Sequence, residues 1–112
     1  MSNKAKIFIR FSFEGFHHWR DAPEHRAYLA TRHRHNFHVE VQCLVNNDDR
    51  EIEFHDLLDC SKSFFDNPER GNQSCEMMAR NLGKFLVERY KRSFTVSVSE
   101  DNECGAIVTT EL

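Results

Sequence analysis

The chain has 112 residues, a formal net charge of -3, 29% charged residues and 39% hydrophobic residues. This length predicts one domain, residues 1–112, with a single modest core. The small negative charge argues against a nucleic-acid partner. The lack of an apolar run of about 20 residues and of a secretory signal argues against a membrane and predicts a cytoplasmic location.

The first predicted element is a strand from about Ala5 to Phe16. Its apolar residues occupy every second position, which is typical of a half-buried strand: Ile7, Ile9, Phe11 and Phe13. His17 continues the core-facing side of this strand. The periodicity is then lost over residues 18–32, which contain Pro23, and we expect a loop long enough to be functional.

The second predicted strand runs from His33 to about Val45 and begins with His-Arg-His. Side chains two residues apart on a strand point to the same face. His33 and His35 should therefore stand side by side, with Phe37 and Val39 continuing their face inward. The polar residues 46–49 predict a turn at the end of this strand.

Two amphipathic helices are predicted next. The first spans about His55 to Phe65, and its apolar residues recur on one side. Residues 66–72 include Pro68 and Gly71 and end it. Ser74 is a plausible N-cap for the second helix, which extends to about Tyr90.

The chain ends with two alternating strands, residues 94–100 and 106–110, joined by a turn. The order ββααββ predicts an α+β fold with a four-stranded antiparallel sheet and two helices on one face. Glu100 ends its strand on the core-facing side. The three histidines described above end theirs in the same way, so we expect one pocket lined by these imidazoles and this carboxylate.

The candidate metal ligands are the three histidines of matching parity: His17, His33 and His35. Neutral imidazoles suit Zn²⁺, which in catalytic sites takes three protein ligands and leaves one position for water or substrate. Surface strands also carry His-x-His pairs without any metal. His18 and His38 have the opposite parity and His25 lies within the loop, so we expect these three to face solvent or to support the site.

Two further features indicate a ligand. Four arginines gather around the loop and the second strand, and guanidinium groups bind phosphate oxygens well: Arg20, Arg26, Arg32 and Arg34. Glu100 could accept a guanidine-like pair of N–H groups from a heterocycle. The alternative is that these side chains are simply solvated.

On these residues the chain resembles the 6-pyruvoyl-tetrahydropterin synthase and 6-carboxytetrahydropterin synthase family. Phe13-Glu14-Gly15-Phe16-His17 is similar to the family's Phe-x-x-x-His, and His33-Arg34-His35-Asn36-Phe37 to its His-Gly-His-Asn-aromatic segment. Glu53-Phe54-His55-Asp56-Leu57 is similar to the Asp-Phe-x-x-Leu that opens the first helix, and Ser74-Cys75-Glu76 to the Thr-x-Glu that opens the second. Ser97-Val98-Ser99-Glu100 resembles the strand that ends in the pterin-anchoring glutamate.

The resemblance implies the tunnelling fold, in which subunits join their sheets into a barrel and barrels stack. It implies a homo-oligomer, commonly a hexamer, with sites between subunits. It also implies Zn²⁺ bound by the three histidines and a lyase acting on 7,8-dihydroneopterin triphosphate or a related compound. The pterin or purine-derived ligand would be bound by Glu100, Ser74 and Glu76, with the arginines facing any phosphate.

The chain departs from the family at the groups that move protons. The family cysteine before the His-x-His is absent, because its slots hold Ala27, Tyr28 and Leu29. Of the family's Asp-His pair, Asp66 stands in the first place and Asn67 in the second. Arg34 replaces a glycine between two ligands.

The remaining candidates for proton transfer are Glu24, His25, Tyr28 and Asp66. Without the family's groups we expect metal polarisation and little turnover by the usual route. Three interpretations stay open: a synthase-like enzyme of divergent mechanism, a catalytically silent module that sequesters or senses a pterin or purine derivative, and a structural relative with no metal.

Overall fold

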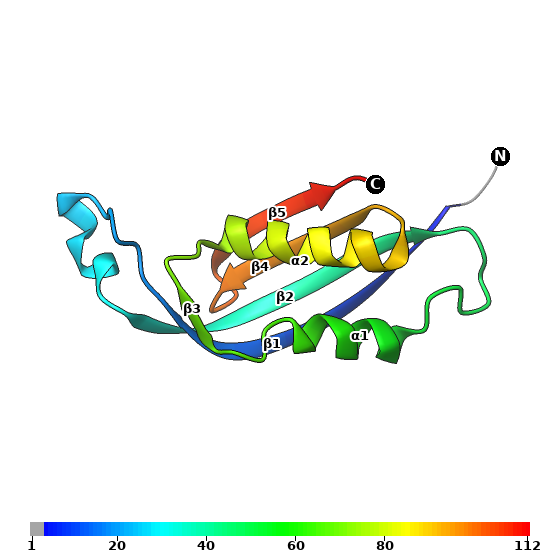
Figure 1. Cartoon of the computed structure of the whole chain (residues 1–112), viewed down its shortest axis with the longest axis horizontal. Helices are drawn as coiled ribbons and strands as arrows, with labels where there is room; N and C mark the ends of the chain where they lie inside the picture. The colour runs from blue at the N-terminus through cyan, green and yellow to red at the C-terminus, as the bar shows by residue number, and fades with distance from the viewer. Residues whose placement is uncertain (1–3) are drawn as a thin grey trace.

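The computed structural model describes residues 4–112. Strands β1 (Ala5–His17) and β2 (His33–Val45) form a long antiparallel hairpin. In its register Ile9 pairs with Val41, and His17 pairs with His33 at the end of the ladder where residues 18–32 connect the two strands. This hairpin runs along the longest axis of the molecule (Figure 1).

The sheet has five strands in the order β3-β1-β2-β4-β5, so the expected number of four was wrong. β4 (Phe94–Glu100) and β5 (Cys104–Thr110) form the expected second antiparallel pair. The additional strand is β3 (Glu69–Gly71), which pairs in parallel with the end of β1. Its pairing depends on two backbone hydrogen bonds, from Phe16 N to Pro68 O (2.9 Å) and from His18 N to Gly71 O (2.9 Å). A strand of three residues carries too little periodicity to be read from sequence.

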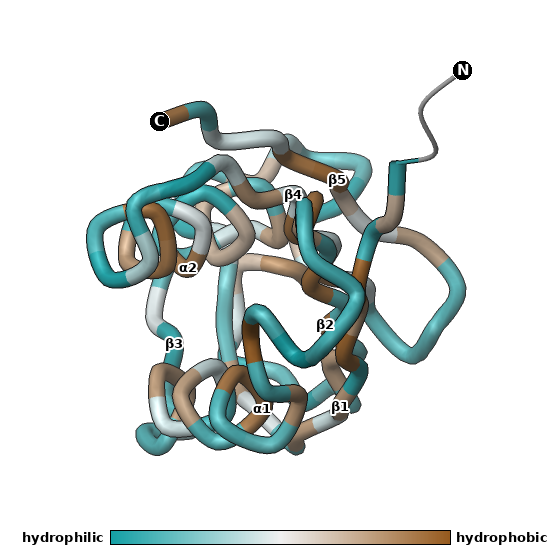
Figure 2. The backbone as a smooth tube through the Cα atoms, turned by 90° about the vertical axis from the view of Figure 1, so that its right-hand side faces the viewer, coloured by the Kyte–Doolittle hydropathy of each residue, from teal (hydrophilic) through white to brown (hydrophobic). Residues whose placement is uncertain are grey.

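The remaining ββααββ order and the α+β class are confirmed. α1 (Phe54–Ser63) packs on β1, and α2 (Cys75–Tyr90) packs on β4 and β5. Seen from the side, both helices lie on the same face of the sheet (Figure 2). The Ser74 side chain accepts a hydrogen bond from Met77 N and is the expected N-cap of α2.

The core lies between this face of the sheet and the helices. Inward residues of the strands alternate with outward polar ones, as the sequence predicts, and each large buried apolar side chain contributes about 1.5–3 kcal/mol. Completely buried members come from both layers: Phe37, Val41, Val96 and Val98 from the sheet, and Leu57, Met78, Leu82 and Leu86 from the helices. The same inward face of β1 and β2 ends in histidines, so the polar site is a direct continuation of the core.

The predicted loop between β1 and β2 contains short 3-10 turns, η1 (Glu24–Ala30), whose residues are all exposed or half-buried. Figure 1 shows this segment, which we call the η1 arm (residues 18–32), projecting beyond the end of the hairpin. Within residues 4–112, no helix is both long enough and apolar enough to cross a membrane.

Candidate metal centre

The backbone ladder brings three imidazoles together. His17 and His33 are direct cross-strand partners, and His35 lies two residues further along the same face of β2. Their possible ligand atoms all lie within 4.8 Å of one another. The cross-strand partner of His35 is Gly15, where a Cβ would lie 2.9 Å from ring carbons of Phe13 and Phe37. Glycine at this position therefore leaves room for the packed rings below the histidines.

Each of the three imidazoles is held by an acceptor at Nδ1. His17 Nδ1 donates to the Gln73 carbonyl oxygen (2.8 Å), and His33 Nδ1 donates to the Thr31 carbonyl oxygen (2.8 Å). His35 Nδ1 donates to Asp101 Oδ2 (2.7 Å). A carbonyl or carboxylate oxygen can only accept, so each Nδ1 carries the proton and each Nε2 keeps its lone pair. Acceptors placed in this way are what orients metal-binding histidines in proteins.

Two of the three Nε2 atoms are buried without a hydrogen-bond partner in the described part of the chain. Across residues 4–112, the buried side-chain atoms without any partner include His17 Nε2 and His35 Nε2. Glu100 Oε2 lies 3.1 Å from the first and 3.6 Å from the second, without hydrogen-bond geometry. These contacts would be ion pairs if the rings were protonated at Nε2, but in the neutral rings, with the proton on Nδ1, the lone pairs repel the carboxylate oxygen unless a cation lies between them. The donor set therefore fits a metal ion.

Burial also favours the neutral form of His17. The pKa of His17 lies below its ordinary value near 6.5, chiefly because its side chain is buried. The Gln73 carbonyl and the Glu100 carboxylate act in the opposite direction, and His33 and His35 act in the same direction. A neutral imidazole is the form that binds metals.

Asp101 is the residue of the site that sequence reasoning missed. It lies in the β4–β5 turn with φ 54, a left-handed conformation that Asp and Asn tolerate better than most residues. Its Oδ1 accepts from Asn36 N (2.9 Å) and its Oδ2 from His35, and these two hydrogen bonds lower the pKa of Asp101. The sequence feature that could have indicated Asp101 is an acidic residue directly after Glu100, in the turn that follows this strand.

The N-terminus of α2 lies on the same side of the site. Gln73, whose carbonyl holds His17, comes directly before the Ser74 cap. Burial, chiefly, together with the charges of Glu100 and Glu76, raises the pKa of the Cys75 thiol to about 12. These interactions place Ser74 and Glu76, both predicted to contact ligand, at the helix end nearest Glu100.

The four arginines do not converge on the imidazoles. Arg32 forms an ion pair with Glu69 (2.7 Å) and lies over the Phe16 ring, and Arg34 pairs with Glu14 (3.4 Å). Phe16 and Arg34 have the parity opposite to the imidazoles, so these pairs lie on the outer face of the sheet.

Arg20 and Arg26 belong to the η1 arm, and both are exposed. The guanidinium of Arg26 donates only to the His25 carbonyl oxygen (3.1 Å). The predicted proton-transfer groups Glu24, His25 and Tyr28 are exposed in the same arm, and Asp66 is exposed after α1. Within this one chain the structure therefore does not bring them to the imidazoles.

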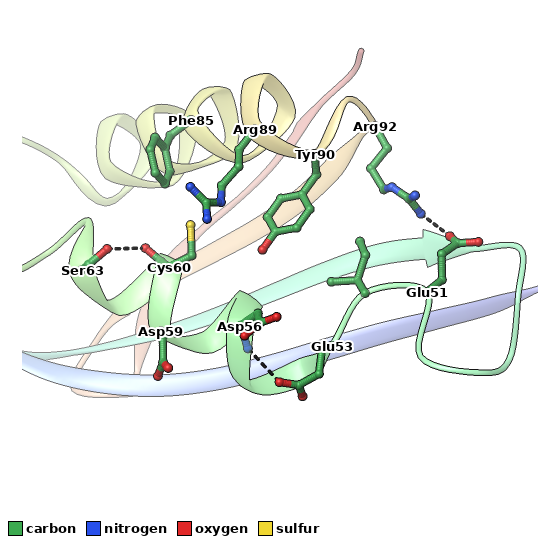
Figure 3. A pocket seen from close by; sticks show the side chains of 11 residues that line it. Glu51, Glu53, Asp56, Asp59, Cys60, Ser63, Phe85, Arg89, Tyr90 and Arg92 are labelled. Carbon is green, nitrogen blue, oxygen red and sulfur yellow. Dashed lines mark hydrogen bonds and ion pairs between the residues drawn. The ribbon is translucent and has the colours of Figure 1, made fainter.

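A groove lies toward the end of the hairpin opposite the imidazoles. Figure 3 shows this groove of about 860 Å³, between α1 and the C-terminal end of α2. Its α1 wall carries Asp56 and Asp59, and its α2 wall carries Arg89 and Tyr90. Arg92 and Glu51 form an ion pair at one end of the groove. Its charged side chains are either paired or exposed to water.

Comparison with known proteins supports the fold. No protein-family model matches the sequence, and no curated protein matches it either. Solved structures of 6-pyruvoyltetrahydropterin synthase do match: a catalytic-residue mutant from Plasmodium vivax with a TM-score of 0.75 at 16% identity, and the Plasmodium falciparum protein with a TM-score of 0.72 at 16% identity. Each match covers 99% of this chain and 100% of the other. The resemblance drawn from the motifs is therefore confirmed as a shared tunnelling fold.

Proposed function

We propose that this chain is a zinc-dependent pterin-binding protein that acts on 7,8-dihydroneopterin triphosphate, or a related purine-derived compound, by a divergent mechanism. We expect it to act in the cytoplasm. The observation that carries the proposal is the orientation of the three imidazoles. Each is fixed through Nδ1, and two buried Nε2 atoms have no partner within the described part of the chain.

Zinc is the ion that best fits this donor set. Three neutral imidazoles with oriented Nδ1 protons are the protein ligands of catalytic zinc sites. His17, His33 and His35 would hold the ion. When bound, it would polarise a carbonyl or hydroxyl oxygen of the ligand.

The rim of the site suits a flat heterocycle with N–H groups. The Glu100 carboxylate would serve as a bidentate acceptor for such groups, and Ser74 and Glu76 at the N-terminus of α2 would contact the ligand beside it. For a phosphorylated ligand, Arg20 and Arg26 are the better candidates. Arg32 and Arg34 already pair with carboxylates.

The proposed active form is a homo-oligomer, with a hexamer expected and sites between subunits. The sheet has an open edge at β5, and β3 covers only the end of the β1 edge. Open edges are usually paired or covered in stable proteins. Joining copies edge to edge would also let the η1 arm of one subunit present Glu24, His25 or Tyr28 to the site of another. Light scattering coupled to gel filtration should give a mass of about six chains, and a monomer would contradict this part of the proposal.

A second candidate is a catalytically silent module that sequesters or senses the same ligand. The observation that favours it is the lack of a suitable proton carrier at the imidazoles of one chain. Two thiols lie near Glu100. Cys75, at the α2 N-terminus, has a pKa of about 12 and stays protonated at neutral pH, and Cys104 is the exposed cross-strand partner of Glu100. The candidates in the η1 arm are exposed.

Incubation of 7,8-dihydroneopterin triphosphate with stoichiometric zinc-loaded protein separates the two. Formation of a new pterin supports the synthase. Unchanged substrate that remains bound in equilibrium dialysis supports the silent module. Failure to bind at all contradicts both, and at saturating zinc the Glu100→Gln variant should bind the pterin more weakly because its amide is a poorer acceptor.

A further inference from the structure

We infer that Glu100 is itself a ligand of the metal while no organic ligand is present, so that the resting site consists of three imidazoles and one carboxylate. This inference rests on the proposed metal site and adds a fourth protein group to it. The geometry of Glu100 Oε2 relative to two Nε2 atoms is the observation that carries it.

The two distances match those between neighbouring ligands of one ion. With metal–ligand bonds of about 2.0–2.2 Å, adjacent ligand atoms in a tetrahedral site are roughly 3.3–3.6 Å apart. Glu100 Oε2 lies 3.1 Å from His17 Nε2 and 3.6 Å from His35 Nε2. A hydrogen bond does not explain this approach, because both Nε2 atoms are without a hydrogen-bond partner in residues 4–112.

The backbone holds Glu100 in this position. It is the last residue of β4 and the cross-strand partner of Phe37, which lies next to His35 on the inward face of β2. Directly after it, Asp101 N donates to Asn36 O (2.7 Å), and Glu103 N donates back to Glu100 O (2.9 Å). The strand end is therefore fixed on both sides, and the approach of the carboxylate follows from the sheet register.

Charge favours the same assignment. Three neutral imidazoles leave the full double charge of a divalent ion in a site where the His17 side chain is only 8% exposed and the His35 side chain 19%. Burying an uncompensated charge costs several kcal/mol. The Glu100 side chain, 28% exposed, is the nearest anion to the Nε2 atoms of these two histidines and would halve that net charge.

This assignment gives Glu100 two successive contacts. In the resting protein its carboxylate binds the metal and occupies the position that a substrate oxygen would take. An arriving heterocycle with paired N–H groups offers the same carboxylate a bidentate partner, and the metal then gains an open position. The site would thus be closed to water and small anions until its ligand enters.

The direct test is a crystal structure of the zinc-loaded protein without organic ligand, with the ion located by its anomalous scattering. We expect a Glu100 carboxylate oxygen about 2.0–2.2 Å from the zinc. A zinc held by the three imidazoles with Glu100 more than about 3 Å away would overturn the inference and leave the proposed function standing. Zinc bound elsewhere or not at all would contradict the proposed function as well.

Zinc affinities in solution provide a second test. Chelator competition should show at least about tenfold weaker binding for Glu100→Gln. Glu100→Asp keeps the charge but shortens the reach by one methylene, and it should be weakened similarly. Glu103→Gln removes a carboxylate from the same turn and should stay within about threefold of the unmodified protein. Unchanged affinity in Glu100→Asp would show that charge alone acts, and unchanged affinity in Glu100→Gln would show that Glu100 has no role at the metal.

Discussion

The two ends of the β1–β2 hairpin differ in how their polar groups are satisfied. The groove between α1 and α2 has a volume of about 860 Å³ and is lined by both acids and arginines, but these are paired or reach water. At the other end of the hairpin, imidazoles with a fixed proton position present buried Nε2 atoms that have no partner in the described residues.

Cavity size therefore does not identify the functional end of this protein. Buried polar atoms are almost always hydrogen-bonded, and an exception calls for an explanation such as an ion. In the groove, Arg92 Nε also lacks a partner within residues 4–112, but it is a single N–H donor of a guanidinium that already pairs with Glu51. The histidine end offers a specified ligand geometry, so substitutions at the two ends should have different effects on zinc binding.

The largest expected effect comes from removing an imidazole. His33→Ala should lose zinc affinity by about 100-fold or more, because two ligands hold zinc far less well than three. His38→Ala is the matched control, since His38 lies on the same strand with the opposite parity. Elemental analysis and chelator competition measure both. Equal losses in the two variants, or a loss in Asp56→Asn of the groove, would remove the contrast.

Asp101 should strengthen zinc binding without contacting the ion itself. Asp101→Asn keeps an oxygen that can accept from Asn36 N, but its amide cannot both do so and accept from His35 Nδ1. We expect zinc affinity to fall about 10–100-fold, the usual effect of losing such a support. Asp48→Asn, in an exposed turn, should leave the affinity unchanged. Wild-type affinity in Asp101→Asn would mean that the orientation of His35 does not depend on this contact.

The stability of the metal-free protein should depend on pH through His17. Unfolded His17 binds a proton near pH 6.5, whereas the folded form has a lower pKa because of burial. Stability from this residue is therefore complete above about pH 6.5 and is lost as the pH falls through this value toward the folded pKa. Melting temperatures from pH 7.5 to 5.5 should fall less steeply for His17→Gln than for the unmodified protein, and parallel curves would contradict the assignment.

The smallest effect is expected at the groove. The Arg92 guanidinium holds the pKa of Glu51 below its ordinary value, so their pairing stabilises the protein above about pH 4.5 and is lost as the pH falls. Glu51→Gln should lower the melting temperature slightly at pH 7 and not in acid. Its zinc content should be that of the unmodified protein. A change in zinc content would connect the two ends of the hairpin.

The alternation of apolar and polar residues along the strands, together with the N-cap of α2, predicted most of the fold. Inward parity placed His33, His35 and Phe37 on one face, and Ser74 was identified as an N-cap from its residue type and place. β3 was missed because its pairing depends on the backbone of residues 68–71, which carry no period. A hydrogen bond between backbone groups that are distant in the sequence leaves no trace in the pattern of side chains.

The sequence was sufficient to predict the three histidines of the candidate site. It was not sufficient to predict the groups that accept hydrogen bonds from their Nδ1 atoms. Matching parity suggested that His17 joins the His-x-His pair, because the pattern of each strand is local. The acceptors for their Nδ1 atoms include two backbone carbonyls, of Gln73 and Thr31, and every residue has a carbonyl. The parity of Glu100 was read correctly, but its approach to two Nε2 atoms required the register between β2 and β4.

Zinc content of the purified protein, never exposed to chelator, tests the central claim most directly. We predict about one zinc per chain by elemental analysis, held with the affinity of a three-histidine site. A value well under half a zinc per chain, in protein that is folded by circular dichroism and not restored by added zinc, would contradict the metal centre and the function proposed for it.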